Sequence, residues 1–248
     1  MITKAEIQLV RSLSDKRNRE EQGLFVAEGE KLISEIRSSK LRIRRIYALE
    51  GLFRGEEVEV VTPKELERMT QLKTANNSLA LVEIPHHQLR IDDLKGRLSL
   101  ALDQVQNPGN LGTIVRLADW FGIEHIFCSQ GTVDVYNPKT VQATMGALAR
   151  VKLHYCNLPS LISSLKDVPV YGTFLDGKDM YGEALSANGL IVMGNEGNGI
   201  GQEVASLINR KLYIPNYPPQ RETTESLNVA MATGIICAEF RRRAISVG

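Results

Sequence analysis

The chain has 248 residues, of which 43% are hydrophobic, and a formal net charge of +1. This composition predicts a folded protein with a sizeable core, built as one large or two small domains. A net charge so close to zero provides no overall field to draw the chain to nucleic acid. No apolar run approaches the ~20 residues of a membrane span, and Lys4 and Glu6 interrupt the amino terminus before any apolar signal core, so we expect a cytoplasmic protein.

Cysteine and histidine usage supports the same expectation. Cys128, Cys156 and Cys237 lack C-x-x-C spacing, which is typical of a protein from a reducing compartment. The four histidines form no H-x-x-x-H pattern, so no metal site is predicted.

The first third of the chain is denser in charge than the rest and predicts a small α/β domain. A helix over residues 3–14 is followed by a polar turn over residues 14–23. Thr62 and Glu65 form a capping box around Pro63, where a helix is expected to start. Further predicted elements are the strands 24–27, 45–49, 58–61 and 79–84, and a helix over 28–38. The polar stretch 85–93 is the predicted linker, which gives domains at 1–93 and 94–248.

A basic cluster lies in this first domain, formed by Arg37, Lys40, Arg42, Arg44 and Arg45, with no acidic residue between them. These cations could bind RNA phosphates and release counterions. Alternatively, they could be the solvated edge of a sheet, which lysine and arginine protect from aggregation. The sequence leaves both interpretations open.

The second domain alternates strands with helices, which predicts an α/β fold with a parallel sheet covered on both faces. The predicted strands are 98–105, 125–129, 151–155, 168–175, 190–193 and 211–215. The predicted helices are 111–121, 138–148, 158–165, 202–208 and 227–243.

The most informative stretch is LIVMGNEGNGIG, residues 190–201. Four apolar residues read as a buried strand, and the glycines read as the loop at its carboxyl end, where open α/β sheets bind ligands. Glu196 inside the loop argues against a phosphate cradle, and neither standard nucleotide fingerprint is present. A tight strand-to-helix connection would also need these glycines.

Two further loops follow predicted strands. The first contains Asn110 and Arg116, and an arginine near a helix start suits phosphate, although most arginines lie on the surface. The second contains Ser226 and Asn228 at the start of the last helix, where Ser226 could be a plain helix cap.

Together these segments resemble the SpoU/TrmH family of SPOUT RNA methyltransferases over residues 98–243. The resemblance rests on three motifs in order: NLGTIVR at 110–116 with ADWFG at 118–122, VMGNEGNG at 192–199, and Ile214-Pro215 followed by SLNV at 226–229. GLFVAEG at 23–29 resembles the amino-terminal RNA-binding domain of a ribosomal-RNA branch. The segment 216–225 is longer than the family pattern and lacks its glycine.

The resemblance implies a SPOUT methyltransferase domain with a carboxyl-terminal trefoil knot, a homodimer, and bound S-adenosylmethionine. It implies methyl transfer to a ribose 2′-hydroxyl of RNA, most naturally ribosomal RNA. By analogy, Gly194, Ile214 and Leu227 contact the cofactor. The residues that it places at the reacting hydroxyl, or in support of it, are Asn110, Arg116, Glu196, Ser226 and Asn228.

The implied role of Arg116 needs a physical choice, because arginine rarely deprotonates. We favour a guanidinium that binds phosphate and stabilises the developing alkoxide over a general base. The alternatives are a tRNA methyltransferase, a non-catalytic RNA-binding protein and a dinucleotide-dependent oxidoreductase; the missing G-x-G-x-x-G argues against the last. The four family residues Asn110, Arg116, Glu196 and Asn228 argue against loss of catalysis.

Overall fold

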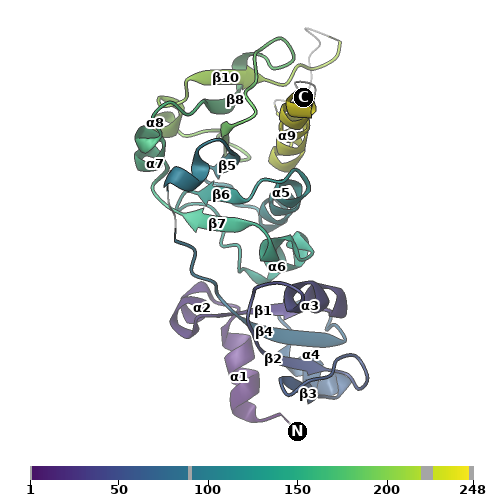
Figure 1. Ribbon diagram of the computed structural model, residues 1–248. Coiled ribbons are helices and arrows are strands. Elements are labelled where there is room, and N and C mark those ends of the chain that lie inside the picture. Colours follow the sequence, from purple (N-terminus) through teal and green to yellow (C-terminus); the bar gives the residue numbers. More distant parts are fainter. Residues whose placement is uncertain (1, 89–90, 219–225, 246–248) are drawn as a thin grey trace. The chain divides into compact units, whose positions relative to one another are not determined.

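The computed structural model describes residues 2–88, 91–218 and 226–245. The chain forms two compact α/β units, whose elements are labelled in Figure 1. The first unit holds Met1–His86 together with Asp134–Arg150, and the second holds His87–Val133 and Val151–Gly248. In the described part of the chain, no helix is long and apolar enough to cross a membrane.

The first unit is built on a four-stranded sheet with the order β1-β4-β2-β3. β4 runs antiparallel to β1 and β2, whereas β2 and β3 are parallel. The strands are β1 (Leu24–Glu28), β2 (Ile43–Ala48), β3 (Val58–Val60) and β4 (Ser78–Glu83). The helices are α1 (Lys4–Ser12), α2 (Lys16–Gln22), α3 (Glu30–Arg37), α4 (Pro63–Met69), α6 (Pro138–Thr144) and the short η2 (Ala147–Ala149).

Both faces of this sheet are covered, which explains why every residue of β1 is buried. Val26 belongs to a core cluster with apolar residues of α1 and α4, such as Val10 and Leu66. The neighbouring residue of a strand points to the opposite face. There, the ring of Phe25 lies 4.8 Å from that of Tyr136, and α3 and α6 pack on β1. The segment 134–150 therefore packs with the first unit, although it follows the predicted linker in sequence.

Two predicted elements of this unit were wrong. The polar turn over residues 14–23 is the helix α2, which Asp15 caps and Gly23 ends with a left-handed φ of 62°. Its residues pair as Lys16–Glu20 and Arg17–Glu21, and the helix escaped the prediction because it lacks an apolar stripe. The helix predicted to reach residue 148 stops at Thr144 because Met145 takes the left-handed conformation.

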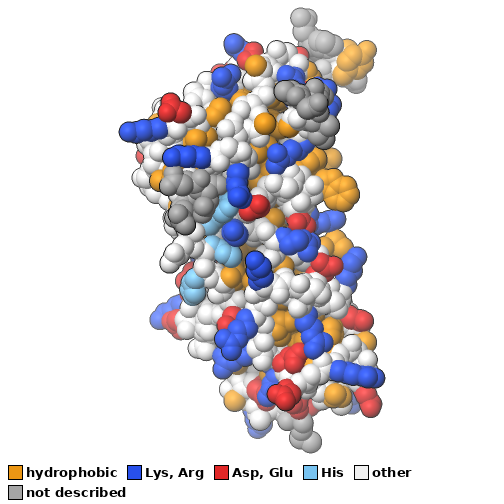
Figure 2. Space-filling view, in the orientation of Figure 1, with side chains coloured by type: hydrophobic (Ala, Val, Ile, Leu, Met, Phe, Trp, Pro, Cys, Tyr) orange, Lys and Arg blue, Asp and Glu red, His pale blue; other side chains and the backbone are white. Residues whose placement is uncertain are grey.

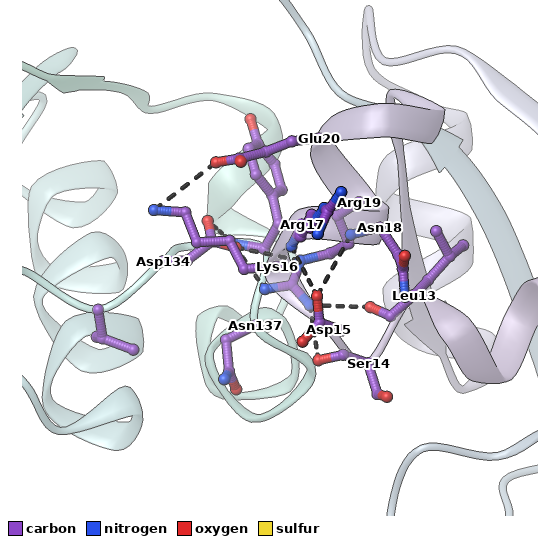
Figure 3. Close-up of polar contacts among 12 residues, drawn as sticks. Leu13, Ser14, Asp15, Lys16, Arg17, Asn18, Arg19, Glu20, Asp134 and Asn137 are labelled. Carbon is purple, nitrogen blue, oxygen red and sulfur yellow. Dashed lines mark hydrogen bonds and ion pairs between the residues drawn. The ribbon is translucent and has the colours of Figure 1, made fainter.

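A buried arginine fastens the segment 134–150 (Figure 3). Arg19 is 2% exposed, and its Nη2 lies 2.6 Å from Oδ2 of Asp134. Its Nε donates to the same oxygen, and its Nη1 donates to the carbonyls of Leu13 and Ser14. All three nitrogens of the guanidinium thus donate hydrogen bonds inside the protein, and a buried charge is tolerated when it is paired and hydrogen-bonded in this way.

The second unit is a six-stranded sheet with the order β10-β8-β9-β5-β6-β7, and every pairing in it is parallel. This confirms the predicted parallel α/β sheet. Its strands are β5 (Leu98–Leu102), β6 (His125–Cys128), β7 (Lys152–Tyr155), β8 (Val170–Asp179), β9 (Gly189–Met193) and β10 (Arg210–Tyr213). Its helices are η1 (Ile91–Leu94), α5 (Pro108–Trp120), α7 (Leu158–Ser164), α8 (Gln202–Ala205) and α9 (Val229–Ile245).

The helices of this unit form two layers (Figure 1). α7 and α8 share a core cluster with β5, β6 and β9, whereas α5 and α9 pack against each other on the other side of the sheet. Because all strands are parallel, the loops after β5, β8, β9 and β10 emerge at one edge of the sheet. These loops carry the three motifs.

Candidate functional site

The glycine-rich loop is a tight backbone hairpin. Asn195 and Gly199 exchange backbone hydrogen bonds of 2.8 and 3.0 Å, and Oδ1 of Asn195 accepts from the N–H groups of Gly197 and Asn198. A Cβ atom on Gly194 would lie only 2.2 Å from the carbonyl carbon of Gly199. Gly194 is therefore required by the loop itself, and a larger residue there would displace backbone before it met any ligand.

This loop forms one wall of a cavity of about 430 Å³. The cavity lies beside the middle of β8, at the carboxyl ends of β9 and β10 and at the start of α9. Five of the predicted site residues line it: Gly194, Glu196, Ile214, Ser226 and Leu227. The middle of β8 also contributes Thr173, Phe174 and Leu175, which the sequence analysis placed in a strand without assigning them to a site. Residues 219–225, which make up most of the longer segment 216–225 noted above, lie outside the described residues.

Glu196 links the glycine loop to the start of α5. Its Oε1 accepts from the Asn107 N–H at 3.1 Å and from Nδ2 of Asn110 at 3.0 Å, and its Oε2 accepts from the Gln106 N–H at 3.2 Å. Burial alone would raise the pKa of Glu196, but these hydrogen bonds outweigh it and hold the pKa below its usual value. The carboxylate thus stays ionised and acts as an acceptor.

An amide chain extends from Glu196 with a fixed direction. A carboxylate only accepts, so Asn110 must turn its NH₂ group toward Glu196. The Oδ1 of Asn110 then accepts from Nδ2 of Asn228 at 3.0 Å. The Oδ1 of Asn228 is left to accept from the N–H groups of Ala230 and Met231, and so it caps α9. All three motifs are joined through these side chains.

Sequence reasoning missed the residues that shape the loops themselves. Asn107 caps α5 by accepting from the N–H groups of Gly109 and Asn110, and Pro108 occupies the first helical position. The pair Asn107-Pro108 is a recognisable helix-start signal. The carboxylate of Asp103 accepts from the Gly201 N–H at 2.8 Å, and no sequence pattern pointed to it.

Arg116 lies apart from this amide chain, six residues or about 1.7 turns beyond Asn110 along α5. Its side chain is exposed and makes no hydrogen bond or ion pair with the residues that the structure describes. One turn on, Trp120 is 84% exposed, and Met231 on the adjoining helix α9 is 62% exposed. The structure thus brings together Asn110, Glu196 and Asn228, and it presents Arg116 to the solvent.

The predicted RNA-binding residues Arg42, Arg44 and Arg45 lie at the start of β2. β2 pairs with β4 along its length, but with β3 only from Ile46 to Ala48, so RNA binding and protection of a sheet edge both stay predictions for this cluster. Arg42 pairs loosely with Glu83 at 3.6 Å, and Arg45 lies close enough to Glu6 to interact with its charge, whereas Arg44 is exposed without a partner among the described residues. On the face shown in Figure 2, basic side chains are interspersed with acidic ones.

Fold and site together define an α/β protein with a cavity at one end of a parallel sheet and without a dinucleotide fingerprint. The profile of the SpoU rRNA Methylase family matches residues 97–238, and that of the MRM3-like substrate binding domain matches residues 4–80. The chain belongs to the SpoU rRNA Methylase family.

Individual relatives span both units. A 23S rRNA guanosine 2′-O-methyltransferase of Bacillus subtilis, RlmP, is 30% identical over 93% of this chain and 94% of its own length. A solved structure of a TrmH-family protein from Porphyromonas gingivalis is 36% identical, with a TM-score of 0.88 over 98% of this chain and 99% of the other. The AdoMet-bound rRNA methyltransferase of Sinorhizobium meliloti is 30% identical, with a TM-score of 0.84 over 98% and 96% of the two chains.

Proposed function

We propose that this protein transfers a methyl group from S-adenosylmethionine to a ribose 2′-hydroxyl of ribosomal RNA. The observation that carries the proposal is the hydrogen-bonded chain from Glu196 through Asn110 to Asn228, beside a cavity at the carboxyl ends of the sheet. Membership of the SpoU family and the 2′-O-methyltransferase RlmP as a relative over nearly the whole chain support it.

The cavity fits a nucleoside cofactor. Its walls combine apolar side chains, such as Ile214 and Leu227, with the backbone of the glycine loop, a mixture of apolar and polar groups that suits a nucleoside. Gly194, Ile214 and Leu227 would hold the adenosine part. When bound, S-adenosylmethionine supplies a methyl group on a sulfonium, so the protein's task is positioning and electrostatics.

We assign the reacting hydroxyl to the start of α5. Glu196 holds Asn110, with Asn228 on its other side, and thereby fixes where the amide can meet a ribose; Ser226 lines the same cavity. Arg116 has five N–H donors and no partner among the described residues, so its guanidinium is available to a substrate phosphate and to the developing alkoxide. Glu196 is committed as an acceptor and is not assigned as the base.

We further propose a homodimer, a trefoil knot in the carboxyl-terminal part and a cytoplasmic location. The knot rests on family membership. The dimer is supported by Trp120 and Met231, two large apolar side chains exposed on helices that pack together, because such exposed groups mark interaction surfaces. Three cysteines that form no disulfide are consistent with the cytoplasm.

The division of labour follows the two family profiles. The SPOUT domain, proposed as 94–248, binds the cofactor, and the region proposed as 1–93 binds RNA, with Arg42, Arg44 and Arg45 as phosphate contacts. Arg44 is the strongest candidate among the three. Arg42 pairs with Glu83 and Arg45 lies near Glu6, whereas Arg44 is exposed and has no partner among the described residues.

The test is methyl transfer from labelled S-adenosylmethionine to total RNA of cells that lack this protein, followed by mapping of the modified ribose. Incorporation into 23S ribosomal RNA at a single 2′-oxygen is the expected result. Incorporation only into tRNA would replace ribosomal RNA by tRNA as the substrate, and RNA binding without incorporation would leave a non-catalytic binding protein.

Arg116 offers the sharper test of the assigned roles. We expect Arg116→Ala to retain cofactor affinity and to lose about 10²–10³-fold in turnover, as for other removed electrostatic donors. Arg116→Lys should also be impaired, because a point charge does not replace a planar fork. Turnover of the alanine variant at the wild-type rate would contradict the assignment.

A further inference from the structure

A second cavity of about 640 Å³ lies within the first unit, at the start of α3. The proposed function gives it no role. We call it the amide cavity, because Asn76, Asn77 and Gln142 contribute side-chain amides to its lining. The residues of interest are Glu30, Lys31, Asn76, Asn77, Gln142 and Met145.

The amide cavity is assembled from segments far apart in sequence. Residues 30–31 begin α3 and residues 76–77 precede β4, whereas Gln142 and Met145 come from the segment 134–150. The buried Arg19–Asp134 pair holds that segment at one end, and the exposed Arg150–Glu35 pair, at 2.9 Å, joins it to α3 at the other. A fixed wall of this kind is what a specific binding site requires.

The backbone at the rim of the cavity lies close to α3. A Cβ atom on Gly146 would lie 2.8 Å from Cβ of Glu35, so this glycine lets the segment approach α3 closely. The preceding residue, Met145, has a φ of 49° and is 48% exposed. A non-glycine residue rarely adopts this conformation, and such backbone strain clusters at binding sites.

Several polar groups in the cavity are free to bind. The side-chain amides of Asn76 and Gln142 and the ammonium of Lys31 make no hydrogen bond or ion pair with the residues that the structure describes. Asn77, by contrast, is used internally: it donates to Glu30 at 3.2 Å and accepts from the Ser78 hydroxyl. Two unused amides thus offer both donors and acceptors in one cavity.

The charge of the cavity argues against a phosphate. Lys31 is the one cation among its described lining residues, and Glu28 and Glu30 line the same space. The carboxylate of Glu28 is satisfied by the Thr70 hydroxyl and the Gln71 N–H, but it remains a nearby negative charge. Amides read the edge of a base, which carries neighbouring donors and acceptors, and an exposed methionine can pack on its face.

We propose that the amide cavity receives an unpaired base of the RNA substrate, with Asn76 and Gln142 reading its edge and Met145 covering its face. This inference rests on the proposed function, since it takes RNA as the substrate, and on the match of residues 4–80 to a substrate binding domain. Sequence-specific RNA recognition commonly uses unstacked bases in this way.

The experiment measures binding of the full chain to an unmodified 23S rRNA transcript at several salt concentrations, with the variants Asn76→Ala and Gln142→Ala. We expect the Kd of each to rise about tenfold, the cost of losing a good base contact, with an unchanged salt slope, because no phosphate contact is lost. Gln8→Ala is the matched control: it removes an exposed, unpaired glutamine from α1 in the same unit and should bind as wild type.

A photoreactive residue at Met145 provides the second readout and should cross-link to one unpaired nucleotide. An unchanged Kd in both alanine variants would overturn the proposal, and a lower salt slope would overturn it in favour of a phosphate site. Methyl transfer by the wild-type protein, measured in parallel, distinguishes a failure of the cavity assignment from a failure of the proposed function. If the wild type transfers methyl groups and both variants keep the wild-type Kd, only the assignment of the cavity is wrong. If the wild type transfers methyl groups to no RNA, the proposed function is wrong.

Discussion

Asn228 performs two tasks with one amide group. Its oxygen caps α9, and its nitrogen donates to Asn110, whose own nitrogen donates to Glu196. The ionised carboxylate at the end of this chain sets the orientation of both amides, because it cannot donate. The geometry of the site at the residue scale thus depends on a charge at Glu196.

The fixed direction of these hydrogen bonds, from Asn228 to Asn110 to Glu196, leads to a prediction for Asn228→Asp. Aspartate caps a helix as well as asparagine does, so α9 should keep its start. However, the second carboxylate oxygen would face the Asn110 oxygen, and the chain cannot reverse because Glu196 accepts only. We expect a small change in unfolding temperature but methyl transfer reduced by at least about tenfold, as for a lost hydrogen bond of ~1.5 kcal/mol. Transfer at the wild-type rate would show that the amide chain is dispensable.

Glu196 should also give the site a dependence on pH. Its pKa is lowered in the folded protein, so the stability that it contributes is complete above the unfolded value of 4.5 and is lost as pH falls through the folded value. We expect the difference in unfolding temperature between wild type and Glu196→Gln to be constant near neutral pH and to shrink below about pH 4.5. A difference that persists unchanged at lower pH would mean that the charge of Glu196 does not stabilise the loop.

At the scale of elements, the segment 134–150 depends on partners distant in sequence. Arg19 from α2 meets Asp134, and Phe25 from β1 meets Tyr136. α2 consists mostly of charged residues, and Arg19 is the one that it buries. Although α2 has no apolar stripe, its Arg19 therefore fixes the position of the segment 134–150 in the first unit.

We predict that Arg19→Met destabilises the full chain by about 3 kcal/mol, because it leaves Asp134 without its partner in a mostly buried place. The double variant Arg19→Met/Asp134→Leu should recover part of this loss, since no unpaired charge remains. Denaturant unfolding of the wild type, the two single variants Arg19→Met and Asp134→Leu, and the double variant measures the coupling. If the two substitutions changed the free energy of unfolding additively, the Arg19–Asp134 pair would not stabilise the fold as a pair.

At the scale of the whole molecule, the chain passes between the two units more than once. It leaves the first unit after His86, returns at Asp134 and leaves again after Arg150. The two units are therefore not separated by one cut. Val135, Val141 and Leu148 are buried in the folded chain and belong to the segment that packs with the first unit.

A fragment of residues 95–248 should consequently expose these three apolar side chains and aggregate more readily than the full chain. Co-expression with residues 1–93 should restore solubility by covering them, and the two fragments should copurify. Light scattering and copurification measure this. A fragment that stays soluble and monodisperse alone would show that the segment 134–150 refolds onto the second unit.

The sequence by itself determined the alternation of strands and helices, the parallel sheet and the three loops that carry the site. These follow from local patterns: apolar runs for buried strands, capping signals such as Thr62 and Glu65, and glycines where the backbone must turn. The resemblance of its motifs also assigned Gly194, Ile214 and Leu227 to one cofactor site, and in the structure all three line a single cavity.

Only the tertiary structure decided which side chains meet and what each is used for. Spacing could not show that Glu196 and Asn110 bond across 86 positions, or that Arg19 is a buried clamp 115 positions from Asp134. It could not place β2 inside its sheet, nor bring Gln142 beside Asn76. The physical reason is that these contacts depend on how separate elements pack, and packing reflects the burial of the whole chain, which no local pattern records.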